Sequence, residues 1–198
     1  MNLSNDWRSV TAPEIATFGN ESARAHAWSA RGWIGALLRH TLNNVTLALD
    51  GTVFVHGGIT VEWARLGVDE INARARKALL REEWGNAVFE RPRGPLWYRG
   101  YALEEEEEVC TELKAALALL SAKRMVIGHT PQLATGEILS RCDGRVFVID
   151  VGITTRYGGN CAALEIVEDT VTALYCIDDK PEEARRVDMT PRQGHGEL

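Results

Sequence analysis

Several features that mark special classes of protein are missing from this chain. No apolar run approaches the roughly 20 residues that a membrane-spanning helix needs. Basic residues are outnumbered, 22 against 28 acidic ones, and the formal net charge of -6 argues against binding to nucleic acid or to an anionic membrane surface. The segment Met1 to Val10 is polar and lacks the apolar core of a signal peptide. We therefore expect a cytoplasmic protein without nucleic-acid or membrane partners.

Cysteine is scarce, and its spacing excludes two common motifs. The chain has 4 cysteines, namely Cys110, Cys142, Cys161 and Cys176. None of them forms a C-x-x-C pair, so the sequence contains neither a zinc knuckle nor a thioredoxin-type motif. In a cytoplasm-like compartment cysteines stay reduced by default, and we expect Cys161 and Cys176 to be buried thiols in strands.

What is present is typical of a globular protein. Hydrophobic residues make up 45% of the 198 residues and charged residues 25%, which is enough for one domain with a sizeable core. We expect that domain to span residues 1–177. From residue 178 onward the chain is charged and polar and contains Pro181 and Pro191, which predicts a disordered tail over residues 178–198.

Local patterns along the chain predict an α/β protein. Apolar spacing predicts helices over residues 21–40, 61–89 and 103–122. Two β-prone runs flank Asp50-Gly51, a pair that favours a type I′ turn and therefore a hairpin over residues 45–55. Further strands are expected at residues 124–127, 145–149, 161–166 and 171–176.

Two loops carry the residues best suited to chemistry. In each, a hydrophobic strand is followed by a histidine beside glycine: His56 before Gly57 and Gly58, and His129 after Gly128. A histidine at the end of a strand projects into a loop-lined crevice, and glycine lets backbone approach a ligand closely. Neutral imidazole binds Mn, Fe and Zn. The alternative is a hydrogen-bonded structural histidine, and spacing alone leaves the two interpretations level.

The order of these motifs resembles a known family. The run Phe54 to Ile59 resembles the fourth motif of calcineurin-like metallophosphoesterases, and Val126 to Thr130 resembles their fifth. Between them, Gly94 to Arg99 resembles the arginine-bearing segment of the Shewanella-like protein phosphatase branch, and Ile149 to Gly152 resembles its closing strands. The resemblance implies the C-terminal half of a metallophosphatase β-sandwich flanked by helices, with a helical insertion over residues 61–93.

By that resemblance, His56 and His129 are ligands of the second ion of a two-metal site, and Arg99 binds the substrate phosphate. The implied reaction is the hydrolysis of phosphomonoesters in a phosphorylated protein or a small phosphoester, with divalent Mn, Fe or Zn as the cofactor. Arg99 has an alternative interpretation as one half of a surface ion pair. Asp150 is equally open, because it is expected either to support a histidine or to form a turn.

The family's first three motifs, G-D-x-H-G, G-D-x-x-D-R-G and G-N-H-E, are missing from this sequence. The nearest match, Gly19-Asn20-Glu21, lacks the histidine. Met1 therefore resembles an internal methionine, and the chain is expected to be a truncated form or the product of an alternative start or gene-model error. We expect negligible phosphatase activity from this chain alone. The alternatives are a non-catalytic remnant or binding module, and complementation by a second chain.

Overall fold

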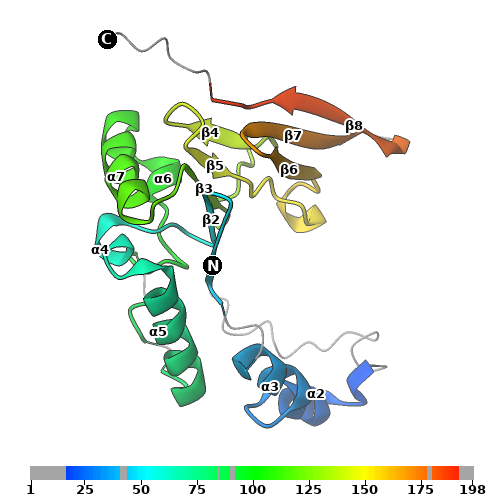
Figure 1. Cartoon of the computed structure of the whole chain (residues 1–198). Coiled ribbons are helices and arrows are strands. Elements are labelled where there is room, and N and C mark those ends of the chain that lie inside the picture. The colour runs from blue at the N-terminus through cyan, green and yellow to red at the C-terminus, as the bar shows by residue number, and fades with distance from the viewer. Residues whose placement is uncertain (1–16, 41–43, 84, 90–91, 178–179, 192–198) are drawn as a thin grey trace.

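The protein is built in layers around two β-sheets. The computed structural model describes residues 17–40, 44–83, 85–89, 92–177 and 180–191. A five-stranded sheet has the strand order β1-β2-β3-β5-β4, and a three-stranded sheet has the order β6-β7-β8. The larger sheet lies between a helical layer, which includes α4, α6 and α7, and the smaller sheet (Figure 1). The predicted α/β class and sandwich are therefore confirmed.

The elements have the following bounds. The helices are α2 (Glu21–Trp28), α3 (Trp33–His40), α4 (Val61–Ala64), α5 (Gly67–Arg81), α6 (Gly100–Leu103) and α7 (Glu106–Leu119). The strands are β1 (Thr46–Leu49), β2 (Thr52–Val55), β3 (Arg124–Ile127), β4 (Leu139–Arg141), β5 (Val146–Val148), β6 (Ala162–Val167), β7 (Thr170–Ile177) and β8 (Lys180–Asp188). None of the helices in the described part of the chain combines the length and apolar character that a membrane crossing requires.

The predicted hairpin is present. Strands β1 and β2 pair in antiparallel register, with Leu49 opposite Thr52. The two residues between them, Asp50 and Gly51, have φ values of 47° and 73°. Positive φ at both central positions is what a type I′ turn requires, so the Asp-Gly pair sets this hairpin.

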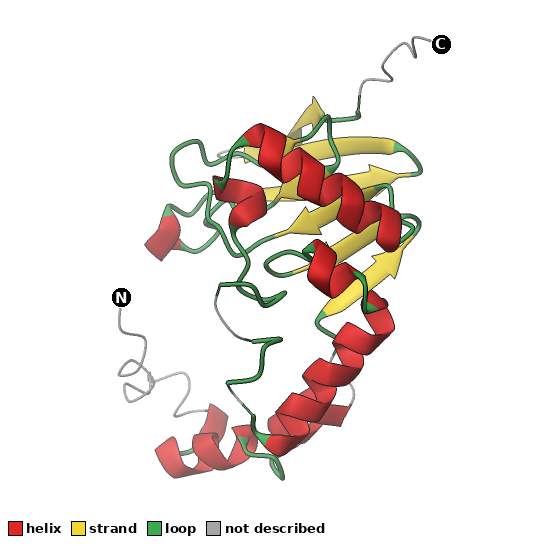
Figure 2. Ribbon diagram, turned by 90° about the vertical axis from the view of Figure 1, so that its left-hand side faces the viewer, coloured by secondary structure: helices red, strands yellow, loops and turns green. Residues whose placement is uncertain are grey.

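Alternation along the central strands separates two cores. In β2, Val53 and Val55 belong to the cluster beneath the helices, whereas Phe54 packs into the cluster between the sheets. Strand β3 repeats the pattern, because Met125 faces the helices and Val126 faces the smaller sheet. Successive side chains of a strand point to opposite faces, so a strand covered on both sides is apolar throughout. Figure 2 shows α7 lying across the helix-covered face.

The predicted helices are interrupted. The expected helix over residues 21–40 is two helices, α2 and α3, and the range 61–89 divides into the short α4 and the longer α5. The range 103–122 contains α7, and the short α6 ends where that range begins. The face that carries Trp33, Leu37 and Leu38 is exposed, with 68% of Trp33 accessible. Helix α3 instead buries Gly35 and Arg39. Arg39 donates a hydrogen bond to the carbonyl of Gly35 and forms an ion pair with Glu82 at 3.7 Å.

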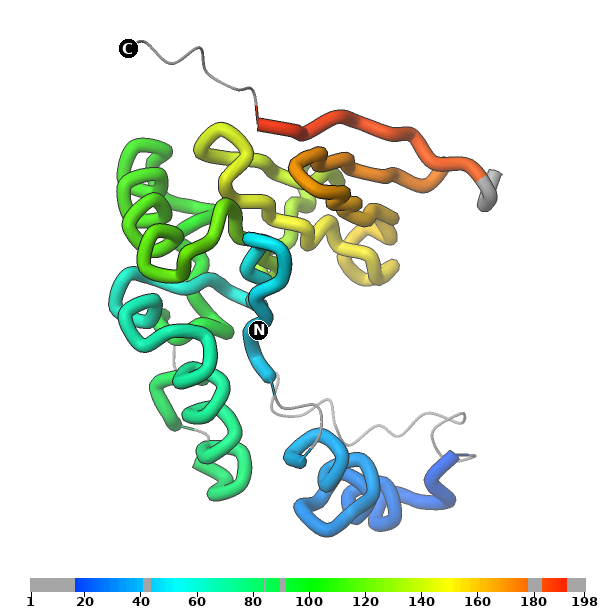
Figure 3. Tube along the Cα trace, viewed as in Figure 1, coloured from blue at the N-terminus to red at the C-terminus, as the bar shows by residue number. Residues whose placement is uncertain are grey.

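The expected disordered tail is wrong over Lys180–Asp188, because these residues form strand β8 (Figure 3). Strand β8 pairs with β7 in antiparallel register, with a shift in the register between Cys176 and Ile177. Val187 packs against the core between the sheets, and Arg186 pairs with Glu165 across the small sheet. The many charged side chains of this segment mask the alternation that predicts a strand. The segment is a strand because it pairs with β7, which the local sequence does not indicate. Residues 192–198 lie outside the described part.

The expectation of reduced thiols is also wrong. Cys110 on α7 forms a disulfide with Cys142, which lies in the turn between β4 and β5, over a Cα–Cα distance of 5.3 Å. Cys161 forms the second disulfide with Cys176, at a Cα–Cα distance of 5.4 Å. Cysteines 32 and 15 residues apart give no local motif, so their pairing depends on the contact of elements distant in sequence.

Candidate functional site

The two histidines of the predicted site lie together because their strands are neighbours. Strands β2 and β3 run parallel, and Val55 is the register partner of Ile127. Parallel strands end at the same edge of a sheet, so the residues that follow them emerge side by side. His129 Nδ1 lies 3.0 Å from His56 Nε2, and the ring centroids are 4.8 Å apart. The pairing of residues 73 positions apart is therefore a consequence of sheet order.

The backbone around His129 holds it in an unusual conformation. His129 has a φ of 65°, a left-handed value that few residues with a side chain adopt. Gly128 donates its N–H to the carbonyl of His56 at 2.9 Å, which continues the pairing of the two strands into the loops. Such strain at a loop end is often found at functional sites.

Gly57 and Gly58 join the first histidine loop to the segment that carries Arg99. Both glycines donate their N–H groups to the carbonyl of Pro95, at 2.8 and 3.0 Å. A Cβ atom on Gly57 would approach that carbonyl oxygen to 2.7 Å, and one on Gly58 would meet the ring of Tyr101 at 2.8 Å. The glycines are thus needed for a close approach of two backbone segments, and their N–H groups are engaged within the protein.

Arg99 is placed beside the second histidine. Its Nη1 donates a hydrogen bond to the carbonyl oxygen of His129 at 2.7 Å and lies 3.4 Å from Thr130 Oγ1. Trp97, two residues earlier, packs edge-on against the His129 ring with the centroids 4.6 Å apart. The predicted site residues His56, His129 and Arg99 are therefore brought into one region. The sequence predicts only a packing role for Trp97. Its contact with His129 joins residues far apart in the chain, so no local pattern indicates it.

The electrostatics of the pair favour neutral imidazole at His56. Partial burial lowers the pKa of His56, and Arg99 lowers it further, while Asp150 acts in the opposite direction. The side chain of Asp150 accepts a hydrogen bond from the N–H of Gly152 at 3.1 Å, which is the turn contact that the sequence left open. The charge of Asp150 still raises the pKa of His56. Asp150 therefore influences the site electrostatically, although its carboxylate is not grouped with the two imidazoles as a metal ligand.

The distance between the two ring nitrogens suits a shared ion. Nitrogen ligands at about 2.0–2.1 Å from one metal ion are themselves about 3 Å apart in common geometries. The two ring nitrogens therefore fit two ligands of one metal ion, and the lowered pKa of His56 favours at that residue the neutral form that metal binding needs.

Further donors around the pair are limited. Among the described residues, Glu106, Cys110 and Cys142 form the one group of three metal-binding side chains whose ligand atoms lie within 4.8 Å of one another. Those sulfurs are joined in a disulfide, and the group does not include either histidine. In the described part of the chain, the histidine pair thus has no third His, Cys, Asp or Glu ligand arranged with it.

Comparisons with known proteins agree with the motif order. No family model matches the chain. An uncharacterised protein of Schizosaccharomyces pombe is 33% identical over 186 residues, which cover 88% of this chain and 54% of that protein. Shewanella-like protein phosphatase 1 of Plasmodium berghei is 30% identical over 80% of this chain and 46% of its own length. Shewanella-like protein phosphatase 2 of Arabidopsis thaliana is 33% identical over 59% of this chain and 31% of its own.

The fold has a solved counterpart. The crystal structure of the cold-active protein tyrosine phosphatase of a psychrophilic Shewanella species matches with a TM-score of 0.69 at 23% sequence identity, over 93% of this chain and 54% of that one. The chain spans about half the length, or less, of the proteins that it matches. The resemblance that the motifs indicated is confirmed: the chain is similar to part of the length of the Shewanella-like protein phosphatases.

Proposed function

We propose that this chain provides the histidine and arginine portion of a metal-dependent phosphoesterase site that acts on phosphomonoesters of proteins. The observation that carries the proposal is the pairing of His56 with His129 at 3.0 Å beside the Arg99 guanidinium. The relatives named as protein phosphatases support the reaction class. Phosphotyrosine, phosphoserine and small phosphoesters all present the same phosphate group to such a site.

Each residue has a distinct task in this proposal. The two imidazoles hold one divalent Mn, Fe or Zn ion, which when bound polarises a phosphoryl oxygen and lowers the pKa of a bound water. Arg99 keeps one guanidinium nitrogen on the His129 carbonyl, which fixes the planar group, and offers its remaining N–H donors to phosphate oxygens. Gly57 and Gly58, through the Pro95 carbonyl, hold the Arg99 segment against the histidine loop.

The limited donor set supports a second candidate, a phosphate- or metal-binding module without catalysis. Two neutral imidazoles leave the charge of a divalent cation uncompensated, and the described residues supply no carboxylate to the pair. Carboxylates from another polypeptide would convert the module into the enzyme. We therefore expect weak metal binding and negligible turnover from this chain alone.

The test measures metal binding and turnover separately. Zn²⁺ or Mn²⁺ is titrated into the chain by calorimetry, and hydrolysis of p-nitrophenyl phosphate is followed in the same buffer. His129→Ala and His56→Ala should each weaken metal binding at least about tenfold, whereas His40→Ala, a histidine at the end of α3, should leave it unchanged. Metal binding that is equal in all four proteins would overturn the ligand assignment. Appreciable turnover that is lost in His129→Ala would instead show that this chain is an enzyme by itself.

A further inference from the structure

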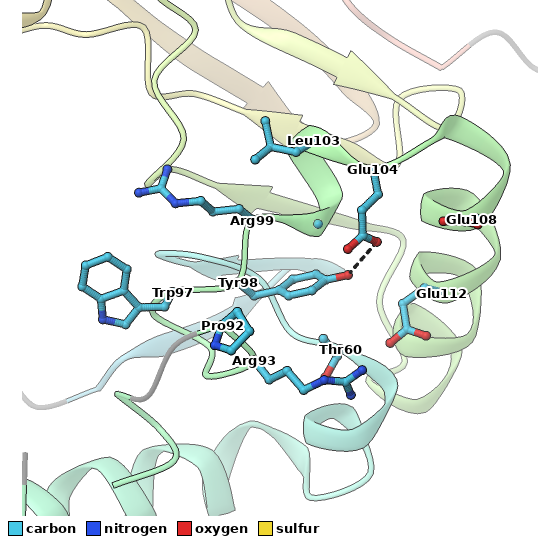
Figure 4. Close-up of a pocket in the computed structure, with 11 residues that line it drawn as sticks. Thr60, Pro92, Arg93, Trp97, Tyr98, Arg99, Leu103, Glu104, Glu108 and Glu112 are labelled. Atoms are coloured by element: carbon cyan, nitrogen blue, oxygen red, sulfur yellow. Dashed lines mark hydrogen bonds between the residues drawn. The ribbon is translucent and has the colours of Figure 1, made fainter. Parts of the chain in front are cut away.

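A cavity lies behind the segment that carries Arg99. Its volume is about 710 Å³, and its walls are formed by residues 97–100, Thr60 and the acidic side of α6 and α7. Figure 4 shows the side chain of Tyr98 pointing into this cavity, while Trp97 and Arg99 on either side point away from it. The cavity therefore shares a wall with the phosphate-binding segment but is separate from the histidine pair.

Three carboxylates face the cavity. Glu108 and Glu112 lie one helical turn apart on α7, and Glu104 is the C-cap residue of α6, two positions before α7 begins. Glu112 accepts a hydrogen bond from the N–H of Val61 at 2.7 Å, and Glu104 accepts one from the hydroxyl of Tyr98 at 3.5 Å. These contacts fix two of the carboxylates at the wall. Figure 4 shows Glu104 and Glu112 directed toward the space beside Tyr98, and Glu108 also lines the cavity.

Two arginines border the cavity, and only Arg99 is turned away from it (Figure 4). The Arg99 guanidinium donates to the carbonyl of His129, on the other side of the segment. Arg93 pairs at 3.7 Å with Glu62, whose carboxylate is not among the groups lining the cavity. Arg93 reaches along the cavity wall toward Thr60 and Glu112 (Figure 4), and its charge acts on Tyr98. It offsets part of the charge of the three carboxylates, and the cavity keeps a net negative charge.

An aromatic wall completes the recognition surface for a cation. Burial, with the charges of Glu104 and Glu112, raises the pKa of Tyr98 to about 12, so its ring is a neutral phenol at physiological pH. The face of a neutral aromatic ring attracts ammonium and guanidinium groups, and the attraction is larger in a partly desolvated site.

A second, independent observation points to a ligand. Thr60, which lines the cavity, is 5% exposed, and its Oγ1 has no hydrogen-bond partner among the described residues. A buried hydroxyl without a partner lowers stability, and native structures contain few of them. A donor group in the cavity would satisfy this oxygen.

We propose that the cavity formed by Thr60, Tyr98, Glu104, Glu108 and Glu112 binds an organic cation, a guanidinium or alkylammonium group. The carboxylates supply the opposite charge, the Tyr98 ring supplies the apolar face, and the Thr60 hydroxyl accepts a hydrogen bond. Two sources carry this chemistry, a small free cation and a basic side chain of a peptide. Tyr98 lies between Trp97 and Arg99, so a bound cation would contact the segment that holds the phosphate-binding arginine.

The probe is L-argininamide, titrated by calorimetry or NMR at low ionic strength without added metal. L-citrullinamide is the matched control, because it keeps the α-ammonium group and replaces only the charged guanidinium by a neutral group. We expect saturable binding of argininamide that weakens with salt, and at least about tenfold weaker binding of citrullinamide. A peptide, acetyl-Gly-Arg-Gly-amide, distinguishes the sources: tighter binding than argininamide assigns a peptide side chain, and weaker binding assigns a small cation.

Two variants test the site without relying on residues of the phosphatase proposal. Glu108→Gln removes one charge at a carboxylate that makes no hydrogen bond or ion pair with the described residues, and should weaken argininamide binding about three- to tenfold. Its control is Glu107→Gln on the same helix, which does not line the cavity and should bind like the parent. Thr60→Val should weaken binding about fivefold while the melting temperature stays the same or rises, because the buried hydroxyl has no partner among the described residues.

The outcomes separate this proposal from the phosphatase proposal. Equal binding of argininamide and citrullinamide, no saturable binding of either, or equal losses in Glu108→Gln and Glu107→Gln would each overturn the cation site. A fall in the melting temperature of Thr60→Val with unchanged binding would overturn the role of Thr60 and leave a structural one. None of these measurements uses metal or turnover, so failure of the phosphatase proposal leaves them unaffected.

Discussion

His56 and His129 owe their position to a few neighbouring residues with little freedom. A Cβ atom at position 57 would come within 2.8 Å of the Trp97 backbone nitrogen, so a side chain there would separate the Arg99 segment from the His56 loop. Gly128 differs, because a Cβ atom at that position would lie 3.7 Å from its nearest neighbour, an ordinary contact. The glycines next to the histidines therefore have different roles. Positions 57 and 58 require glycine because a Cβ atom there would clash with its neighbours, whereas position 128 has space for a Cβ atom.

Glu106 is the residue for which the structure makes a pH-dependent prediction. Hydrogen bonds from the N–H of Cys142 and then from Arg141 lower the pKa of Glu106 below its ordinary value. A carboxyl with a depressed folded-state pKa stabilises the fold above its unfolded pKa of about 4.3, and this contribution is lost as the pH falls through the folded value. Glu106→Gln should therefore lower the melting temperature at pH 7.

The same variant should lose its difference from the parent chain as the pH falls below the unfolded pKa of about 4.3 and through the lower folded one, since both proteins then carry an uncharged side chain at position 106. Melting curves at a series of pH values measure this. Glu107→Gln is the control, since Glu107 is the next residue of α7 and its carboxylate makes no contact with Arg141 among those described. A difference between parent and Glu106→Gln that stays constant over that range would contradict the assignment.

At the scale of elements, cross-links and strand pairs hold distant segments together. The Cys110–Cys142 disulfide joins α7 to the turn between β4 and β5, where Arg141 also donates hydrogen bonds to the carbonyls of Tyr101 and Glu104. These contacts fasten α6 and α7 to the edge of the larger sheet. Because α6 begins directly after Arg99, the helix that Arg141 contacts adjoins the segment that carries Arg99.

Removal of this disulfide should lower stability measurably. A cross-link that closes a loop over a separation of 32 residues reduces the entropy of the unfolded chain, which corresponds to about 4 kcal/mol in the chain-entropy model. We expect Cys110→Ser with Cys142→Ser to lower the urea midpoint of unfolding. The Cys161→Ser, Cys176→Ser pair, which closes a shorter separation of 15 residues, should lower it less.

Urea titrations with and without a thiol reductant provide the check. The reductant should lower the midpoint of the parent chain to near that of a variant lacking all four cysteines, and should leave that variant unchanged. A parent midpoint that does not respond to the reductant, together with free thiols found by mass spectrometry after alkylation, would show that the pairs do not form.

At the scale of the whole molecule, one edge of the larger sheet pairs with no further strand in the described part of the chain. Strand β1 is an outer strand of this sheet, and Leu47 and Leu49 on it are 51% and 56% exposed. Ile149 is also exposed, and together with Leu47 and Phe54 it lines an apolar hollow that reaches His56. An exposed strand edge with apolar side chains favours pairing with another chain.

We therefore expect the isolated chain to self-associate through this edge. Leu47→Lys places a charge on the edge strand and should raise the concentration at which association begins several-fold, without lowering the melting temperature. Ile153→Lys is the matched control, because Ile153 is 67% exposed in a loop away from the edge. Light scattering against concentration measures the difference, and equal behaviour of the two variants would rule out the β1 edge as the association surface.

Much of this protein follows from its sequence alone, because local rules act over a few residues. The Asp50-Gly51 pair determines the hairpin, and apolar runs determine the central strands β2 and β3. The histidine loops are visible as His beside Gly. The distance of 3.0 Å between rings 73 positions apart, the packing of Trp97 on His129 and the two disulfides follow only from the tertiary structure. These features depend on which strands are neighbours, and the packing of the whole core sets the order of strands in a sheet. The same holds for β8, because its charged sequence does not indicate a strand and its pairing with β7 makes it one.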